Sequence, residues 1–330
     1  MLEKLAGEIM EGRRLRSVAE VLGEIGDTPN LLEIELDTFM KYADKIRRFF
    51  CGDKADLCGI INGKSGRCSE DCKFCAQSCY SNTGVEEYNF LDADKIISDC
   101  ELYDSKGVNR YSVVTAGRTL QGEDLNKATE VYEALCTRFP EMKFCGSHGL
   151  MSRDSFAGLK EAGVDMIHCN IETSRRYFPY VCSTHSFDEK LAAIETAKNL
   201  GLKICCGGII GMGETWNDRI DMALTIAETG AVSIPINTLI PISGTPFESQ
   251  KAISQNDILR TVAIFRFINP EAYIRIAAGR FLFEDGGSRL FRAGANATIT
   301  GDMLTTVGNN TTEDRRMLTR LGFSLRKTKC

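Results

Sequence analysis

Short apolar segments and amphipathic stretches alternate along most of the chain. Apolar runs of strand length recur after residue 55, and stretches with the apolar spacing of a helix lie between them. The predicted strands are Leu57–Ile61, Tyr111–Thr115, Lys143–Ser147, Met166–Ile171, Lys203–Ile210, Val232–Leu239, Tyr273–Ala277 and Ala297–Thr300. The predicted helices are Asp94–Ser105, Leu125–Arg138, Asp154–Ala162, Phe187–Leu200, Asn217–Thr229, Asp257–Phe267 and Glu313–Leu321.

This repetition predicts an α/β protein, a (β/α)8 barrel of the TIM type. A doubly wound open sheet is the alternative, because the pattern alone does not show whether the sheet closes. Residues 1–50 have helical spacing interrupted by a turn at Gly26–Asn30, which predicts an N-terminal helical extension. Residues 51–330 show no linker or composition shift, and we expect them to form the barrel as a single domain.

Chemistry in such a barrel lies at the carboxyl ends of the strands. The stretch Arg67–Cys75 directly follows the first predicted strand and holds Cys68, Cys72 and Cys75 in a C-x3-C-x2-C spacing. Three thiolates bind three irons of a cubane iron–sulfur cluster and leave the fourth iron open to another ligand. The alternative, a zinc half-site, requires a second distant cysteine pair, and none stands out.

Glycines and polar residues gather at other predicted strand ends. Gly207–Glu214 follows the fifth strand and lacks the glycine spacing of a dinucleotide or phosphate loop. A charge inside an apolar strand is costly unless it is paired or solvated, so such residues indicate a polar cavity. These polar residues are His168, Asn170, Glu172, Asn237 and Arg275, with Cys145 and Cys205 as candidate thiols in neighbouring strands.

Composition and charge limit the possible partners and the cellular location of the protein. The net charge of −5 gives no general attraction to nucleic acid or to anionic membranes, and no apolar run is long enough to span a bilayer. No signal-peptide pattern opens the chain, so we expect a cytoplasmic protein. Fourteen cysteines in 330 residues then favour metal binding over disulfides, because cytosolic thiols stay reduced.

The cysteine stretch resembles that of the radical S-adenosylmethionine (radical SAM) enzymes, including the aromatic Phe74 before the last cysteine. The resemblance implies that Cys68, Cys72 and Cys75 hold a [4Fe–4S] cluster whose open iron binds the methionyl end of S-adenosylmethionine. Reduction then releases a 5′-deoxyadenosyl radical that abstracts hydrogen. Gly207-x-Ile209-x-Gly211-x-x-Glu214 matches the family's G-x-I-x-G-x-x-E motif, whose strand lies beside the adenine.

Within that superfamily the chain resembles the biotin synthase family from about Ala55 to Gly322. The matching stretches are Asn62–Gly66, Cys75–Ser78, Asn170–Ser174, Gly207–Thr215, Pro235–Asn237, Gly244–Pro246, Arg275 and Ala278–Arg280. The resemblance implies that sulfur is inserted into dethiobiotin to form biotin, that two S-adenosylmethionines are used, and that an auxiliary cluster, commonly [2Fe–2S], donates the sulfur. It also implies a homodimer and an electron donor such as flavodoxin or ferredoxin.

Residue roles follow position by position from the resemblance. Phe74, Asn170, Glu172, Gly207 and Ile209 are expected to bind S-adenosylmethionine. Asn170 and Asn237 are expected to read the ureido ring of dethiobiotin. Cys145, Cys205 and Arg275 match auxiliary-cluster ligands.

Ser112 departs from the family pattern, which usually has the first auxiliary cysteine at that position. Serine oxygen is a harder ligand that is seldom ionised without a metal. Either Ser112 binds iron, or another thiol replaces it, or the cluster is of a different type. The spare thiols Cys169 and Cys206 are near in sequence, but strand alternation predicts that both point away from the cavity. Cys58 is expected to be a core or surface thiol, and Cys79 is an alternative ligand in the loop.

Two other functions remain compatible with these patterns. The first is a related radical enzyme, such as a hydrogenase maturase or a methylornithine synthase, which shares the barrel and the first cluster. The second is a non-catalytic iron–sulfur carrier, which needs no substrate cavity.

Overall fold

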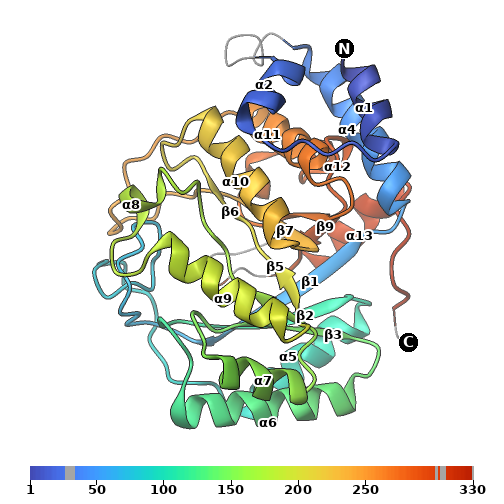
Figure 1. Cartoon of the computed structure of the whole chain (residues 1–330). Helices are drawn as coiled ribbons and strands as arrows, with labels where there is room; N and C mark the ends of the chain where they lie inside the picture. Colours follow the sequence, from blue (N-terminus) through green and yellow to red (C-terminus); the bar gives the residue numbers. More distant parts are fainter. Residues whose placement is uncertain (27–33, 302–303, 305–309, 329–330) are drawn as a thin grey trace.

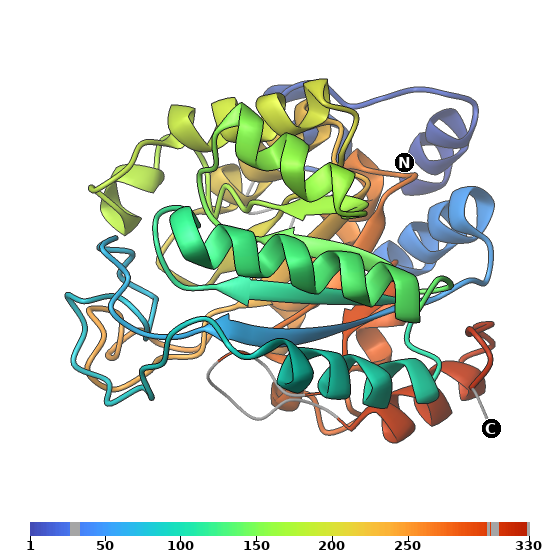
Figure 2. The same cartoon turned by 90° about the horizontal axis from the view of Figure 1, so that it is seen from below.

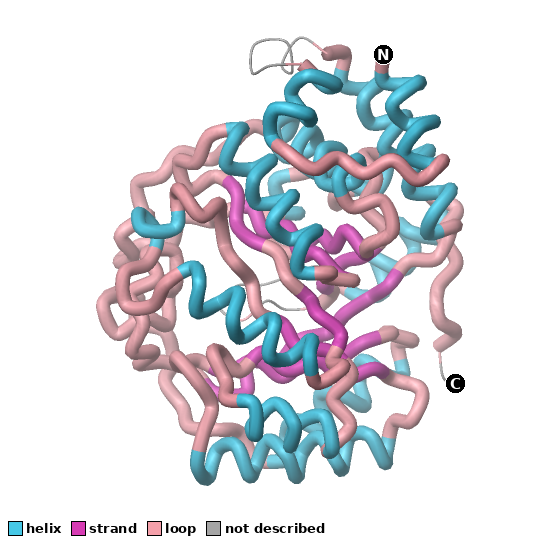
Figure 3. The backbone as a smooth tube through the Cα atoms, in the orientation of Figure 1, coloured by secondary structure: helices cyan, strands magenta, loops and turns pink. Residues whose placement is uncertain are grey.

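A computed structural model of the chain describes residues 1–26, 34–301, 304 and 310–328 (Figure 1). Of the turn predicted at Gly26–Asn30, only Gly26 lies within these ranges, and Cys330 lies outside them. Every strand pairing in the sheet is parallel, and Figure 3 shows the strands inside a layer of helices. The strands are β1 Asp56–Lys64, β2 Arg110–Thr115, β3 Lys143–Ser147, β4 Met166–His168, β5 Lys203–Cys205, β6 Gly208–Ile210, β7 Ser233–Thr238, β8 Tyr273–Ile276 and β9 Ala297–Ile299.

The sheet closes into a barrel. Its strand order is β5-β4-β3-β2-β1-β9-β8-β7-β6, and a further pairing of Cys205 with Ser233 joins β5 to β7. The paired residues can be followed from strand to strand around the ring, starting at Asn62 of β1. After one turn the pairing returns to Lys54, eight residues before Asn62. This shift is the shear of a TIM barrel, so the (β/α)8 prediction is confirmed and the open sheet is excluded.

Helices cover the outside of the barrel and pack on its parallel strands, whose residues are largely buried. Their starts carry local signals: Ser186 and Thr215 each form a capping box with an acidic residue three positions later. The outer helices are α5 Ala93–Ser105, α6 Gly122–Arg138, α7 Arg153–Glu161, α8 Phe178–Val181, α9 Phe187–Asn199, α10 Trp216–Thr229, α11 Gln255–Ile268, α12 Ser288–Arg292 and α13 Thr311–Arg320, with the 3-10 turn η1 Arg280–Leu282.

Three N-terminal helices, α1 Leu2–Met10, α2 Val18–Ile25 and α4 Leu36–Cys51, pack together beside α11 and α12 (Figure 1). The fully buried ring of Phe39 in α4 lies 5.3 Å from the ring of Phe267 in α11. The N-terminal helices therefore share a hydrophobic core with the barrel helices. The division into an extension of residues 1–50 and a barrel of residues 51–330 stays a prediction.

The structure corrects three details of the predicted elements. The fifth predicted strand, Lys203–Ile210, is split into β5 and β6 at Cys206-Gly207. The predicted strand Met166–Ile171 ends at His168, so Asn170 and Glu172 lie beyond β4 instead of within a strand. The short elements α8, η1 and α12 were not predicted, because segments of three to five residues carry too little periodicity to be recognised.

The carboxyl ends of the strands converge on one side of the molecule. In Figure 2 the arrow of β1 points toward the loop that follows it, and the loop after β7 lies against that loop. The amide of Asn82 donates a hydrogen bond to the carbonyl of Gly244 between these two loops. Among the helices of the described ranges, none is long and apolar enough to cross a membrane.

Candidate active site

A cavity of about 370 Å³ opens at the carboxyl ends of the strands and extends into the barrel. Residues from every strand, β1 to β9, and from the loops that follow β1, β4, β7 and β8, line it. The lining includes most of the predicted site residues: Phe74, Cys75, Ser112, Cys145, Asn170, Glu172, Cys205, Ile209, Asn237 and Arg275. Three further predicted site residues are close in sequence to the lining residues but do not themselves line the cavity: Cys68, Cys72 and Gly207.

The cysteine loop folds back on itself at the mouth of this cavity. The amide of Cys68 donates to the carbonyl of Gln77, and the amide of Cys79 donates to the carbonyl of Cys68. The amide of Cys75 donates to the carbonyl of Cys72. Burial raises the pKa of Cys75 to about 11, so this thiol needs a metal or a cation to ionise at neutral pH.

Two carboxylates tie the cysteine loop to the segment between α8 and α9. Glu70 contacts His185 at 2.5 Å, Thr184 at 2.9 Å and Arg118 at 3.3 Å. Burial alone would raise the pKa of Glu70, but the hydrogen bonds from His185 and Thr184 outweigh it and lower that pKa. Asp71 accepts a hydrogen bond from the amide of Ser183. These contacts fix where the three cysteines stand.

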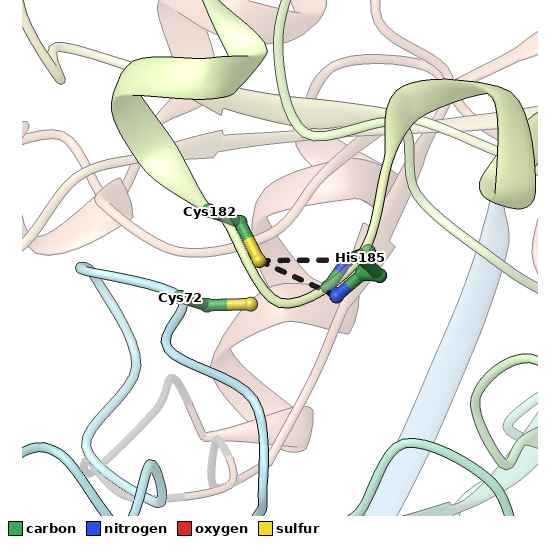
Figure 4. A group of neighbouring side chains, drawn as sticks. All are labelled: Cys72, Cys182 and His185. Carbon is green, nitrogen blue, oxygen red and sulfur yellow. Dashed lines mark hydrogen bonds between the residues drawn. The ribbon is translucent and has the colours of Figure 1, made fainter.

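Cys182 and His185 were not recognised from the sequence. Their donor atoms and that of Cys72 lie within 4.8 Å of one another, and Figure 4 shows the two thiols facing each other. A hydrogen bond from Cys72 lowers the pKa of Cys182 to about 4. Two thiols and an imidazole are also a ligand set for zinc. Because Cys72 belongs both to this set and to the cluster ligands, a zinc ion at this position and the cluster would exclude each other. The Cys-x2-His spacing was the available signal.

The side wall of the cavity comes from the segments after β4 and β5. The side chain of Asn170 accepts a hydrogen bond from the amide of Gly207 at 2.9 Å. Glu172 has a left-handed backbone with φ of 67° and bridges to Gly208. Lys190 of α9 is partly buried and approaches the Glu172 carboxylate at 4.0 Å, a contact that the sequence did not indicate. The strained backbone therefore aims an acidic side chain into the cavity.

The glycine motif is built for close packing. A Cβ atom at Gly207 would lie 1.9 Å from the carbonyl oxygen of Pro235, so only glycine fits between β5 and β7. Glu214 accepts hydrogen bonds from the amides of Gly211 and Met212 and pairs with Arg219. Glu214 therefore holds the turn in place, while Ile209 and Phe74 form an apolar wall with their neighbours.

Deeper in the barrel, inward side chains form stacked layers, as alternate strands supply each layer in a TIM barrel. The registers and the shear of eight put residues from β1, β3, β5 and β8 in one layer, and residues from β2, β4, β7 and β9 in the layer nearer the mouth. The inner layer is Cys58, Cys145, Cys205 and Arg275. The outer layer is Ser112, His168, Pro235 and Ile299.

All eight of these residues line the cavity. Cys58 is a buried thiol, as expected, and it also faces the cavity with Cys145 and Cys205. Cys169 and Cys206 pack in the hydrophobic core outside the cavity, in agreement with strand alternation. Cys79 is exposed at the surface of the loop.

The inner layer is buried and contains a positive charge. Burial raises the pKa of Cys58 to about 11 and raises the pKa of Cys145 and of Cys205 as well. The guanidinium of Arg275 pairs with Asp56 and also donates to Ser233 and to the carbonyl of Thr298. Arg110, the next inward-facing residue below Ser112 on β2, lines the same cavity.

These residues suit an iron–sulfur cluster. Thiols are the ligands that such clusters require, and buried cations favour the thiolate form. The Nε atom of Arg110 is buried and has no hydrogen-bond partner among the described residues. A sulfide or thiolate in the cavity would accept a hydrogen bond from it.

Solved structures of other proteins share this fold. A methylornithine synthase superposes with a TM-score of 0.82 at 20% identity, and 98% of each chain is covered. The FeFe-hydrogenase maturase from Carboxydothermus hydrogenoformans superposes with a TM-score of 0.78 at 16% identity, covering 98% of this chain and 78% of the other. At these identities the likeness establishes the barrel and no common reaction.

Sequence relatives are more specific. The model of the radical SAM superfamily matches residues 64–226, and that of the Biotin and Thiamin Synthesis associated domain matches residues 235–324. Biotin synthases from Clostridium beijerinckii and Alkaliphilus metalliredigens are 56% and 54% identical over 324 residues. These alignments cover 98% of this chain and at least 99% of each relative. With its cysteine loop at the mouth of a barrel cavity and this identity along nearly its whole length, the chain belongs to the biotin synthase family of radical SAM enzymes.

Proposed function

We propose that the barrel cavity holds both halves of the biotin synthase reaction, hydrogen abstraction near the mouth and sulfur insertion from below. The chain is a radical SAM sulfurtransferase of this family, which uses a [4Fe–4S] cluster, S-adenosylmethionine and an auxiliary iron–sulfur cluster. The observation that carries the proposal is the continuous cavity wall from Cys75 at the mouth to Cys145 and Cys205 below. A substrate between these ends would reach both reagents.

At the mouth, we assign Cys68, Cys72 and Cys75 as ligands of the [4Fe–4S] cluster. When bound, this cluster supplies the electron that cleaves S-adenosylmethionine and so generates the hydrogen-abstracting radical. The hydrogen bonds of Glu70 and Asp71 hold the loop in position before the cluster is assembled. Phe74 packs beside the apolar wall of Ile209 and excludes water from this part of the cavity.

S-adenosylmethionine is assigned to the side wall. Glu172 accepts hydrogen bonds from ribose hydroxyls, and the close backbone at Gly207 and Ile209 provides a flat surface for the adenine. Asn170 has an amide nitrogen near the Glu172 carboxylate at 3.4 Å, so it orients that carboxylate. The Lys190 ammonium lies 4.0 Å from the Glu172 carboxylate and places a positive charge beside it.

The dethiobiotin ureido ring is assigned to Asn170 and Asn237, which both line the cavity. Asn237 is held by two hydrogen bonds, one to the carbonyl of Gly208 and one from the amide of Ala278. A fixed amide side chain presents a donor and an acceptor in the pattern that a urea group complements. A substrate held there would have the two carbons that receive sulfur, which are substituents of the ureido ring, facing the inner layer. Cys145, Cys205 and Arg275 in that layer are assigned to the auxiliary cluster, and Ser112 lies in the layer nearer the mouth.

Three further properties are proposed from the family resemblance. The electron donor is a flavodoxin or a ferredoxin, the chain forms a homodimer, and the protein works in the cytoplasm. Reduction of the reconstituted protein by each donor tests the first property. Sedimentation of the anaerobic protein tests the second.

The function is tested by anaerobic incubation of the reconstituted protein with dethiobiotin, S-adenosylmethionine and a reductant. We expect biotin, with two 5′-deoxyadenosines formed for each biotin. The matched control is a Cys145→Ala variant, which we expect to cleave S-adenosylmethionine without forming biotin. Deoxyadenosine formation by the native chain with another substrate, and no biotin from dethiobiotin, would contradict the proposal.

A further inference from the structure

We propose that Cys58 supplies the thiolate that Ser112 cannot, so that Cys58, Cys145 and Cys205 together hold the auxiliary cluster. This inference rests on the proposed function, because it assigns ligands to the sulfur-donating cluster which that function requires. Under this assignment, Cys58 takes the place of Ser112 as a ligand. Its basis is the layer structure of the barrel.

Cys58 lies on the strand next to that of Ser112. In the register of β1 and β2, Ile60 is opposite Ser112 and Cys58 is opposite Arg110. Cys58 and Ile60 both line the cavity, as alternation along a strand requires. Cys58 is therefore the next inward-facing position below Ile60, close to the depth at which the family's missing thiol would stand.

The layer assignment makes Cys58 a better match to the other two thiols than Ser112 is. Cys58, Cys145 and Cys205 come from the alternate strands β1, β3 and β5, which supply one layer at one depth. Ser112 belongs to the next layer toward the mouth. The Ser112 hydroxyl donates a hydrogen bond to the sulfur of Cys145. The charge of Cys58 influences both Cys145 and Arg275, which indicates that these side chains are near each other.

The other candidate ligands are engaged elsewhere. Cys169 and Cys206 pack in the hydrophobic core on the far side of their strands. Arg275 is not a thiol and cannot replace the missing cysteine, and its hydrogen bonds to Asp56, Ser233 and the carbonyl of Thr298 hold the guanidinium beside the assigned cluster. Among the described residues, the Cys58 thiol donates one weak hydrogen bond, at 3.5 Å, to the carbonyl of its neighbour Gly59. Its sulfur is thus open to a stronger partner.

The test isolates the inner site by removing the loop thiols. A Cys68→Ala/Cys72→Ala/Cys75→Ala chain is reconstituted anaerobically with iron and sulfide, and its iron, sulfide and Mössbauer spectrum are measured. We expect this parent to retain one cluster. Addition of Cys58→Ala should remove most of its iron, whereas Ser112→Ala or the matched buried-thiol control Cys206→Ala should leave iron and spectrum unchanged.

A rescue variant separates ligation from folding. If Cys58→Ala only disturbed the barrel, a second change would not restore iron. We expect Cys58→Ala/Ser112→Cys to regain iron, because it returns a thiol to the position that the family usually uses. Cys58→Ser, which preserves the size of the side chain, should keep the circular dichroism of the parent and show a changed spectrum.

The outcomes distinguish the two proposals. A parent triple variant without iron would overturn the proposed function, because no second cluster would exist. A parent with iron that Cys58→Ala leaves intact would overturn the assignment of Cys58 alone. Loss of iron on Ser112→Ala or Cys206→Ala, with iron retained on Cys58→Ala, would assign the third ligand to that other residue.

Discussion

The two groups of cysteines along the cavity are held in different ways. Cys68, Cys72 and Cys75 stand on a loop, and backbone hydrogen bonds together with Glu70 and Asp71 determine their positions. Cys58, Cys145 and Cys205 stand on strands, where the register of the barrel determines theirs. A loop site depends on each of its local contacts. In a strand site, a ligand can move to a neighbouring strand, and so to the adjacent layer, while the other ligands keep their positions.

The largest expected effect separates the two groups by reaction step. Alanine at Cys68, Cys72 or Cys75 should abolish both S-adenosylmethionine cleavage and biotin formation, because the open-iron cluster is lost. Alanine at Cys145 or Cys205 should abolish biotin formation and leave uncoupled cleavage. Chromatographic measurement of deoxyadenosine and biotin in the same samples checks both statements.

Cys79→Ala is the matched control, since Cys79 lies in the same loop and is exposed. It should retain both products. Equal loss of both products from Cys145→Ala and Cys75→Ala would show that the two groups do not act separately.

The second effect compares ion pairs in the two regions. Asp56→Asn leaves the buried Arg275 without its counter-charge, and we expect the free energy of unfolding to fall by about 3–5 kcal/mol. Arg67→Ala breaks the exposed Arg67–Glu87 pair at the mouth and should cost about 0–1 kcal/mol. Denaturant unfolding of the cluster-free chains measures both. Similar costs would mean that the inner layer is hydrated.

The third effect concerns the close approach of strands at the side wall. Gly207→Ala forces a methyl group against the Pro235 carbonyl and should destabilise the chain by about 1–3 kcal/mol. Gly158→Ala, in α7 with open space around the new methyl group, should stabilise it by about 1 kcal/mol. Thermal unfolding of the pair is the measurement. An equal response at both positions would argue against tight packing at Gly207.

A smaller effect distinguishes the two asparagines. Asn170→Ala removes the acceptor of the Gly207 amide and should weaken S-adenosylmethionine binding by about 1 kcal/mol, roughly fivefold. Asn237→Ala should instead raise the KM for dethiobiotin. Steady-state assays that vary one substrate at a time separate the two. Asn170 is assigned to both ligands, so its variant can raise both constants, but an equal rise in both constants for Asn237→Ala would contradict the assignment of Asn237 to dethiobiotin alone.

The smallest expected effect is at Ser112. If the inner cluster is held by the layer of Cys58, Ser112→Ala removes only a hydrogen bond to the Cys145 thiol. The iron content of the triple loop variant should then be unchanged, and the reduction potential of its cluster should shift slightly. A large loss of iron from the Ser112→Ala variant would instead indicate that the Ser112 oxygen is a ligand of the inner cluster.

The sequence was sufficient for the barrel and for the loop cluster, because both depend on local patterns. The strand Lys143–Ser147 was predicted with the bounds of β3, and C-x3-C-x2-C can be read without a structure. Alternation also predicted that Cys169 and Cys206 point outward. The interruption at Cys206-Gly207 was missed because it lies inside a continuous apolar run.

The contents of the inner site depend on register, which a single sequence does not contain. Nothing local shows that Cys58 and Cys145 share a layer, since that follows from the pairing of β1 with β2 and of β2 with β3. Cys182, His185 and Lys190 were missed for a similar reason. Cys182 and His185 reach the cysteine loop, and Lys190 reaches Glu172, through the packing of α8, α9 and the segment between them.

The most direct test of the two-region account is iron anomalous scattering from crystals of anaerobically reconstituted protein. The account predicts two separate iron positions, one at Cys68, Cys72 and Cys75, and one inside the barrel in contact with the sulfur atoms of Cys58, Cys145 and Cys205. A single iron position at the loop would contradict the account. So would an inner iron bonded to the Ser112 oxygen with Cys58 out of contact.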